Sequence, residues 1–191
     1  MKRLMKSWTV AVALGFASIA ISQSQVQARE SAPGAAAAQK VDLRQSASLA
    51  RGLENKHPSE YYKRAAELFQ TGRRDDAVFI YYLGQLRWRI YIKANPSLPP
   101  DGDPALFASL SDVMGRPINQ YAFGDIPVLA RTMQAVLDFD QAYPDRFTSR
   151  TAKPRQRQEV RKGLADLRSD TLAQADFIRA ERLKNGLENR N

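Results

Sequence analysis

The chain has 191 residues, no cysteine and a single histidine, and it carries 29 basic against 20 acidic residues. Without cysteine it forms no disulfides, so side-chain packing must stabilise it. One histidine and no cysteine also exclude ordinary zinc sites, and we expect no cofactor or metal. The net charge of +9 favours partners with acidic surfaces.

The first 28 residues have the pattern of a secretory signal peptide. Lys2, Arg3 and Lys6 precede a mostly apolar run over residues 7–21, and a small-x-small cleavage site ends at Ala28. The apolar run is shorter than the ~20 residues that a membrane-spanning helix needs. We therefore predict cleavage after Ala28 and a periplasmic or secreted protein that does not span the membrane. The alternative is an uncleaved N-terminal anchor. At this address we expect no nucleic-acid partner.

The next segment leads into the folded part of the chain. Residues 29–56 are rich in Ala, Ser and Gln, and we predict a flexible lead-in with a short helix over 48–55. The predicted helical core occupies residues 57–148. Ser59 is expected to cap its first helix, and Gly72 is expected to end it. A second helix, apolar on most sides and therefore central, opens at Asp75 and ends before Asn95-Pro96.

Three further segments complete the predicted elements. Asp103 and Pro104 are expected as the N-cap and first residue of a helix that Gly115 ends. Residues 115–125 form an irregular or short helical connection, and Asp125 begins another helix that Tyr143-Pro144 closes. Residues 149–191 comprise a basic connector over 149–158 and a last amphipathic helix over 159–184 that packs on the core. With no period-two alternation, we predict an all-α fold of five or six helices.

The first two helices carry small and aromatic residues at the spacing of a helical repeat. This hairpin resembles a tetratricopeptide (TPR) or Sel1-like repeat at the positions of its contacts, namely Tyr61, Ala65, Gly72, Ala77, Tyr81 and Gly84. Small residues of this kind let two helices approach closely. The resemblance implies a protein-binding function for a TPR-like antiparallel hairpin. The alternative is that the hairpin is only the core of a compact helical domain.

Residues that could perform chemistry are few. Any Ser-His-Asp arrangement would have to use His57, which precedes a proline at a helix entry and is better explained as a surface or capping residue. Asp101-Gly102-Asp103 lacks the remaining ligands of a calcium loop. Pairs of carboxylates for glycoside hydrolysis would have to come from residues that helix starts and solvated faces also explain, namely Glu60, Glu67, Asp75 and Asp76. We expect no enzyme.

Three groups of residues are candidates for binding. They are the hairpin aromatics Tyr61, Tyr81, Tyr82 and Trp88, which are either contacts or core, the connection residues Asn119, Gln120 and Tyr121, and the connector arginines Arg155 and Arg157. We predict an exported, non-enzymatic module that binds an envelope or secreted protein, such as an immunity protein that neutralises an antibacterial toxin. The alternatives are a basic accessory protein on anionic lipid or glycan and a carboxylate-based cell-wall hydrolase.

Overall fold

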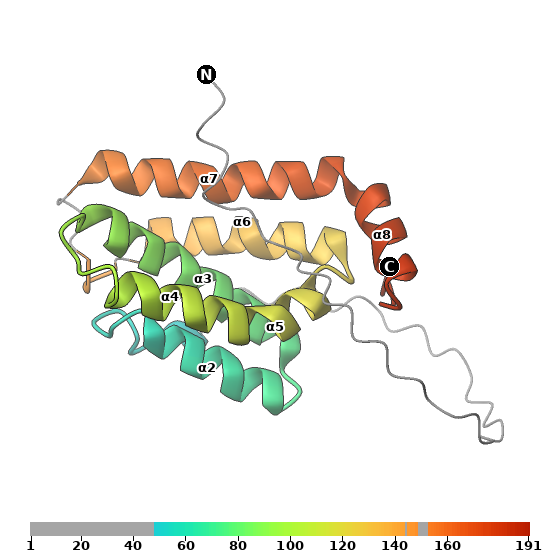
Figure 1. Ribbon diagram of the computed structural model, residues 1–191, viewed down its shortest axis with the longest axis horizontal. Helices are drawn as coiled ribbons and strands as arrows, with labels where there is room; N and C mark the ends of the chain where they lie inside the picture. The colour runs from blue at the N-terminus through green and yellow to red at the C-terminus, as the bar shows by residue number, and fades with distance from the viewer. Residues whose placement is uncertain (1–47, 144, 149–152) are drawn as a thin grey trace.

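A computed structural model describes residues 48–143, 145–148 and 153–191 of the chain. Within these ranges all regular structure is helical, which confirms the predicted all-α class. The elements run from α2 to α8, after helical residues 48–50 (Figure 1). The predicted signal peptide and the lead-in up to residue 47 lie outside the described residues, as does the connector over 149–152.

Helices α2 (Ser59–Gln70) and α3 (Arg74–Ala94) form a hairpin around a tight turn. Gly72 takes a φ of +83°, a left-handed conformation that glycine adopts at little cost, and thereby ends α2 as predicted. The two helices approach each other most closely at Gly84 of α3, which lies next to the Cβ atom of Tyr61 on α2. The predicted cap is one residue out: Pro58 is the N-cap, and Ser59 is already helical, with its hydroxyl on His57.

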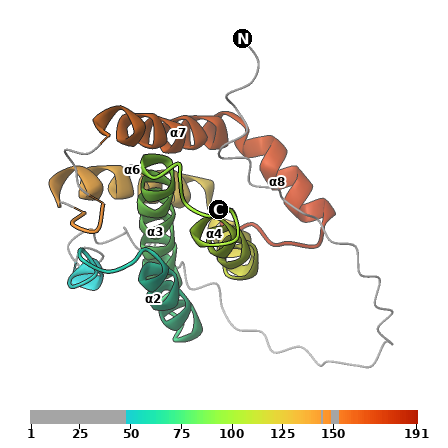
Figure 2. The same cartoon turned by 60° about the vertical axis from the view of Figure 1, so that its left-hand side comes forward.

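Helix α3 is the centre of the molecule. Its residues from Ala77 to Trp88 are all buried, because α2 covers one side and α5, α6 and α7 cover the others. In Figure 2, α3 stands between α2 on one side and the α6–α7 layer on the other. The apolar density of this stretch therefore predicted its central position correctly.

Helices α4 (Asp103–Val113) and α5 (Gly115–Ala122) follow each other almost without a break. Every residue of α4 is at least partly exposed, so this helix lies at the surface and contributes no fully buried side chain to the core. Gly102 is its N-cap and Asp103 its first residue, which corrects the predicted cap: the Asp103 carboxylate contacts His57 instead. Gly115 begins α5, so the predicted connection is a helix.

Helices α6 (Ile126–Ala142) and α7 (Pro154–Ala173) lie side by side and pack across α3 (Figures 1 and 2). Asp125 caps α6 as predicted, since its side chain accepts a hydrogen bond from the Val128 N–H at 3.0 Å. The predicted connector over 149–158 is partly wrong, because α7 begins at Pro154. A proline is suited to a first helical turn, where its missing N–H costs nothing.

The predicted last helix is two helices. The chain bends at Gln174 and continues as α8 (Ala175–Lys184), which turns away from the α7 axis (Figure 1). Arg182 Nη1 donates to the Gln120 carbonyl at 2.8 Å, and the Arg190 N–H donates to the Gly124 carbonyl at 2.7 Å. These hydrogen bonds join α8 and the C-terminal tail to carbonyls at the C-terminal end of α5.

The contact at Gly84 is testable. A Cβ at this position would lie 2.6 Å from the Tyr61 Cβ, which is fixed to the α2 backbone and cannot rotate away. We expect Gly84→Ala to force α2 and α3 apart and to lower the free energy of unfolding by about 2 kcal/mol, measured by urea denaturation. An unchanged or raised unfolding midpoint would show that the hairpin does not depend on this close approach.

Candidate functional site

The four predicted hairpin aromatics are core residues. Tyr61, Tyr81 and Tyr82 are each 1% exposed, and Trp88 is fully buried. Burial raises the pKa of Tyr61 and of Tyr81 to about 12, so their hydroxyls stay protonated throughout the physiological range. Of the two roles that the sequence left open, the structure favours core over contact for all four, and a docking surface must be sought elsewhere.

The three predicted residues of the connection lie on α5 and hold neighbouring elements. Asn119 Oδ1 accepts from the Tyr82 hydroxyl at 3.1 Å. The Tyr121 hydroxyl donates to Asp75 Oδ1 at 3.0 Å, and the Arg190 guanidinium lies 3.6 Å from the centre of its ring. Gln120 is exposed, and its carbonyl accepts from Arg182. These contacts fix α5 against α3 and the C-terminal segment.

The two predicted connector arginines have different surroundings. Arg155 is exposed in the first turn of α7. The Arg157 side chain is only 11% exposed and lies 3.7 Å from Asp140 Oδ1, and its Nη2 donates to the Thr148 carbonyl at 3.1 Å. Only Arg155 therefore faces solvent as a surface cation, while Arg157 belongs to a buried ionic cluster.

That ionic cluster surrounds the carboxylate of Asp140, which is 1% exposed. Arg161 Nη1 donates to its Oδ2 at 2.6 Å, and the Nε of Arg87, a residue that is itself 1% exposed, lies 3.5 Å from its Oδ1. Arg87 also donates to the Tyr61 hydroxyl and to the Tyr143 carbonyl. One carboxylate thus joins α3, α6 and α7, and through Arg87 it reaches α2 and the segment after α6.

A second polar row contains the single histidine. His57 Nδ1 lies 2.8 Å from Ser59 Oγ, and His57 Nε2 lies 2.8 Å from Asp103 Oδ1. The ring packs edge-on against Trp88, Tyr91 and Phe147. The three residue types match a catalytic triad, and sequence spacing gave no sign that Asp103 would complete the row.

The amides around this row argue for a structural role. Nδ1 also accepts from the Ser59 N–H at 3.2 Å, and the Glu60 and Tyr61 N–H groups donate to the carbonyls of His57 and Pro58. Acyl transfer needs free donors for an oxyanion, and the first turn of α2 has its N–H groups engaged. His57 thus accepts from the first N–H of α2, one of the two roles expected of it, and the row ties the start of α2 to the start of α4.

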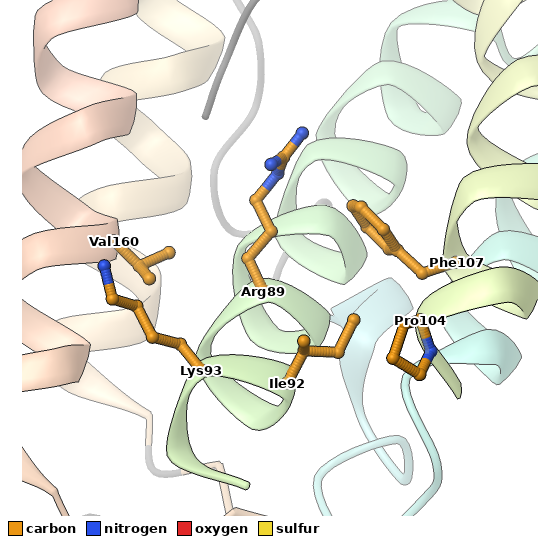
Figure 3. Close-up of a pocket in the computed structure, with 6 residues that line it drawn as sticks. All are labelled: Arg89, Ile92, Lys93, Pro104, Phe107 and Val160. Carbon is orange, nitrogen blue, oxygen red and sulfur yellow. The ribbon is translucent and has the colours of Figure 1, made fainter. Parts of the chain in front are cut away.

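An open groove lies between α3, α4 and α7. Its floor is Arg89, Ile92 and Lys93 of α3, and its walls are Pro104 and Phe107 of α4 and Val160 of α7; it encloses about 300 Å³ (Figure 3). Most of this lining is apolar. Figure 3 shows Arg89 rising from α3 between Val160 and Phe107, with Lys93 one turn further along the same helix. The groove therefore combines apolar walls with two cations.

The two cations of the groove differ in their surroundings. The Arg89 guanidinium lies 4.9 Å from the centre of the Phe107 ring, and burial lowers the pKa of Arg89. Lys93 is 40% exposed, and its Nζ lies 2.7 Å from Glu159 Oε1 on α7. Sequence analysis missed these residues, although two cations one turn apart in an otherwise apolar helix are a usable signal.

Comparisons with known proteins identify no relative of this chain. No protein-family model, no curated protein and no solved structure matches the chain. Among residues 48–143, 145–148 and 153–191, no helix is long and apolar enough to cross a membrane. The same residues contain no cluster of acidic or histidine side chains that would hold a metal ion.

The cluster around Asp140 predicts a large mutational effect. In Asp140→Asn, Arg87, Arg157 and Arg161 would lose the charged carboxylate that all three contact. We expect a loss of about 3–5 kcal/mol in the free energy of unfolding, measured by urea denaturation. The control is Asp166→Asn, which breaks an exposed pair with Lys162 on α7 and should change stability by less than about 1 kcal/mol. Equal effects of the two substitutions would contradict a structural role for the cluster.

Asp145 makes the stability of the protein depend on pH, and its replacement is expected to stabilise the fold. Its side chain is 3% exposed, and desolvation raises its pKa despite the nearby guanidinium of Arg87. A carboxyl with a raised pKa in the folded state stabilises the fold when protonated, and that contribution is lost as the pH rises through the folded pKa. We expect Asp145→Asn to be more stable than the parent at pH 7, with a difference that shrinks toward pH 4.

This expectation is checked by thermal unfolding of both proteins between pH 4 and pH 8. The asparagine keeps the Oδ1 that accepts from the Phe147 N–H at 3.0 Å, so the substitution changes charge with little change in hydrogen bonding. A parent protein that is more stable than the variant at pH 7 would contradict the prediction.

Proposed function

We propose that this chain is an exported, non-enzymatic protein-binding module of the cell envelope and that the groove between α3, α4 and α7 is its docking surface. The observation that carries the proposal is the groove itself, whose largely apolar walls enclose two cationic side chains. Exposed apolar surface around fixed polar groups is typical of sites that recognise a partner. Export rests on the predicted signal peptide.

The resemblance of the α2–α3 hairpin to a TPR or Sel1-like repeat supports the same class of function. The hairpin aromatics are buried, however, and its outer face carries ion pairs such as Lys63 with Glu60 and Arg64 with Glu67. We therefore assign the hairpin the role of scaffold and the groove the role of contact. Neutralisation of a secreted antibacterial toxin is a specific form of this function.

The alternative of a basic accessory protein on anionic lipid or glycan rests on exposed cations such as Arg155. Exposed charge pairs weaken as ionic strength rises, whereas contacts between apolar surfaces do not. Retention of a partner at high salt would therefore favour the groove, and complete loss at high salt would favour the alternative.

The absence of cysteine allows a sharp test, because a single introduced cysteine is a unique attachment point. Glu159→Cys places a maleimide-linked benzophenone at the rim of the groove, and Glu67→Cys places it on the outer face of α2. Residues 29–191 of both variants are incubated with envelope extract at high salt and irradiated. We expect one discrete protein adduct from position 159 and none from position 67.

Each other result has a defined meaning. Adducts from position 67 alone would move the docking surface to the hairpin and contradict the assignment to the groove. Adducts from neither position at high salt, together with acidic material that is retained at low salt and eluted at high salt, would contradict protein binding and favour the alternative of anionic lipid or glycan.

A further inference from the structure

Helix α8 projects from the end of α7 and presents an uncovered apolar face (Figure 2). Phe177 and Leu183 on this short helix are 64% and 63% exposed. The opposite face holds the helix to the rest of the chain, since Arg182 donates to the carbonyls of Gln120 and Glu188. Large apolar side chains that gather on one exposed face mark a surface for association with another molecule.

The exposed residues of α8 lie along one side of the helix. Phe177, Ala180 and Leu183 follow one another at intervals of three residues, which places them as neighbours on the helix surface. Asp176 and Lys184 flank this apolar row at its two ends, and both are exposed. The face thus consists of an apolar row with an acid at its start and a base at its end.

This face is complementary to itself, because its residues are arranged symmetrically about Ala180. In an antiparallel pair of α8 helices with a two-fold axis at Ala180, Phe177 of each copy is level with Leu183 of the other. The same axis brings Asp176 level with Lys184. The small side chain of Ala180 allows the two helices to approach closely. A parallel pair would instead oppose identical charges at both ends, which disfavours that arrangement.

The ion pairs within α8 are compatible with this arrangement. Asp176 Oδ1 accepts from Arg179 Nη1 at 3.0 Å, yet the Asp176 side chain is 101% exposed. Lys184 Nζ lies 3.5 Å from Glu181 Oε1, and the Lys184 side chain is 74% exposed. A carboxylate has two oxygens and accepts from more than one donor, so Asp176 keeps Arg179 when it also meets a lysine of a second copy.

We infer that this protein forms a two-fold symmetric homodimer through antiparallel pairing of α8, with Ala180 at the axis. Apolar contact provides the association, and the pairs of Asp176 with Lys184 fix the direction of the helices. The inference goes beyond the proposed function and does not depend on it. Val160 lies near the start of α7, at the end remote from α8, so the pairing does not use the groove.

Sedimentation velocity tests the dimer on the predicted mature chain, residues 29–191. One pair of short helices is a small interface, so we expect a dimer that dissociates on dilution. Phe177→Ser should weaken it by about tenfold or more, because the symmetry removes an apolar side chain from both halves of the interface. Val113→Ser on α4 is the matched control, since Val113 is 68% exposed, and it should leave the dissociation constant unchanged. A chain that stays monomeric at every concentration, or equal effects of the two substitutions, would overturn the inference.

A charge swap tests the register. Asp176→Lys and Lys184→Asp each place like charges at both ends of the interface, and each should weaken the dimer by about threefold or more. The double variant with both substitutions restores opposite charges and should recover the parental dissociation constant. A double variant that is weaker than either single variant would contradict the pairing of positions 176 and 184.

The direction of the helices is tested by cross-linking, which the absence of cysteine makes specific. Asp176→Cys and Lys184→Cys chains are mixed and oxidised, and the products are identified by mass spectrometry. We expect the mixed disulfide between positions 176 and 184 to exceed both symmetric products. Symmetric products without the mixed one would show parallel pairing, and equal cross-linking by a Glu67→Cys chain would show random collision; either result would overturn the inference.

Discussion

The structure depends on the burial of α3. A helix that is apolar on most sides must be covered on most sides, and α2, α5, α6 and α7 provide that cover. The strip of α3 that lines the groove holds Arg89, which lies against Phe107, and Lys93, which pairs with Glu159. The groove is therefore a consequence of how α3 is packed, and its charge follows from the residues that α3 places there.

The layers around α3 are held by polar contacts as much as by apolar ones. The Asp140 carboxylate gathers Arg87, Arg157 and Arg161, while His57 ties the start of α2 to Asp103 at the start of α4. The Asp140 carboxylate is buried, and buried charges are costly unless every partner is present, so its cluster favours a single arrangement of the helices. In the absence of disulfides, these contacts are what fix α4 and α7 on the two sides of the groove.

Helix α4 forms one side of the groove. Each of its residues is partly exposed, Phe107 and Leu110 pack against the core, and Asp103 ties its start to His57. Elements with few buried contacts are the ones that open most easily.

Sequence patterns alone predicted the all-α class, the central position of α3, the Gly72 turn and the Asp125 cap, because each depends on local spacing or on one residue's conformational preference. It left open whether the hairpin aromatics are core or contact, and it missed the groove. Only the tertiary structure decided these points, since the burial of Tyr61 depends on which helix covers it. Likewise Asp103 meets His57, and Glu159 meets Lys93, across large separations in the chain that periodicity within a helix does not report.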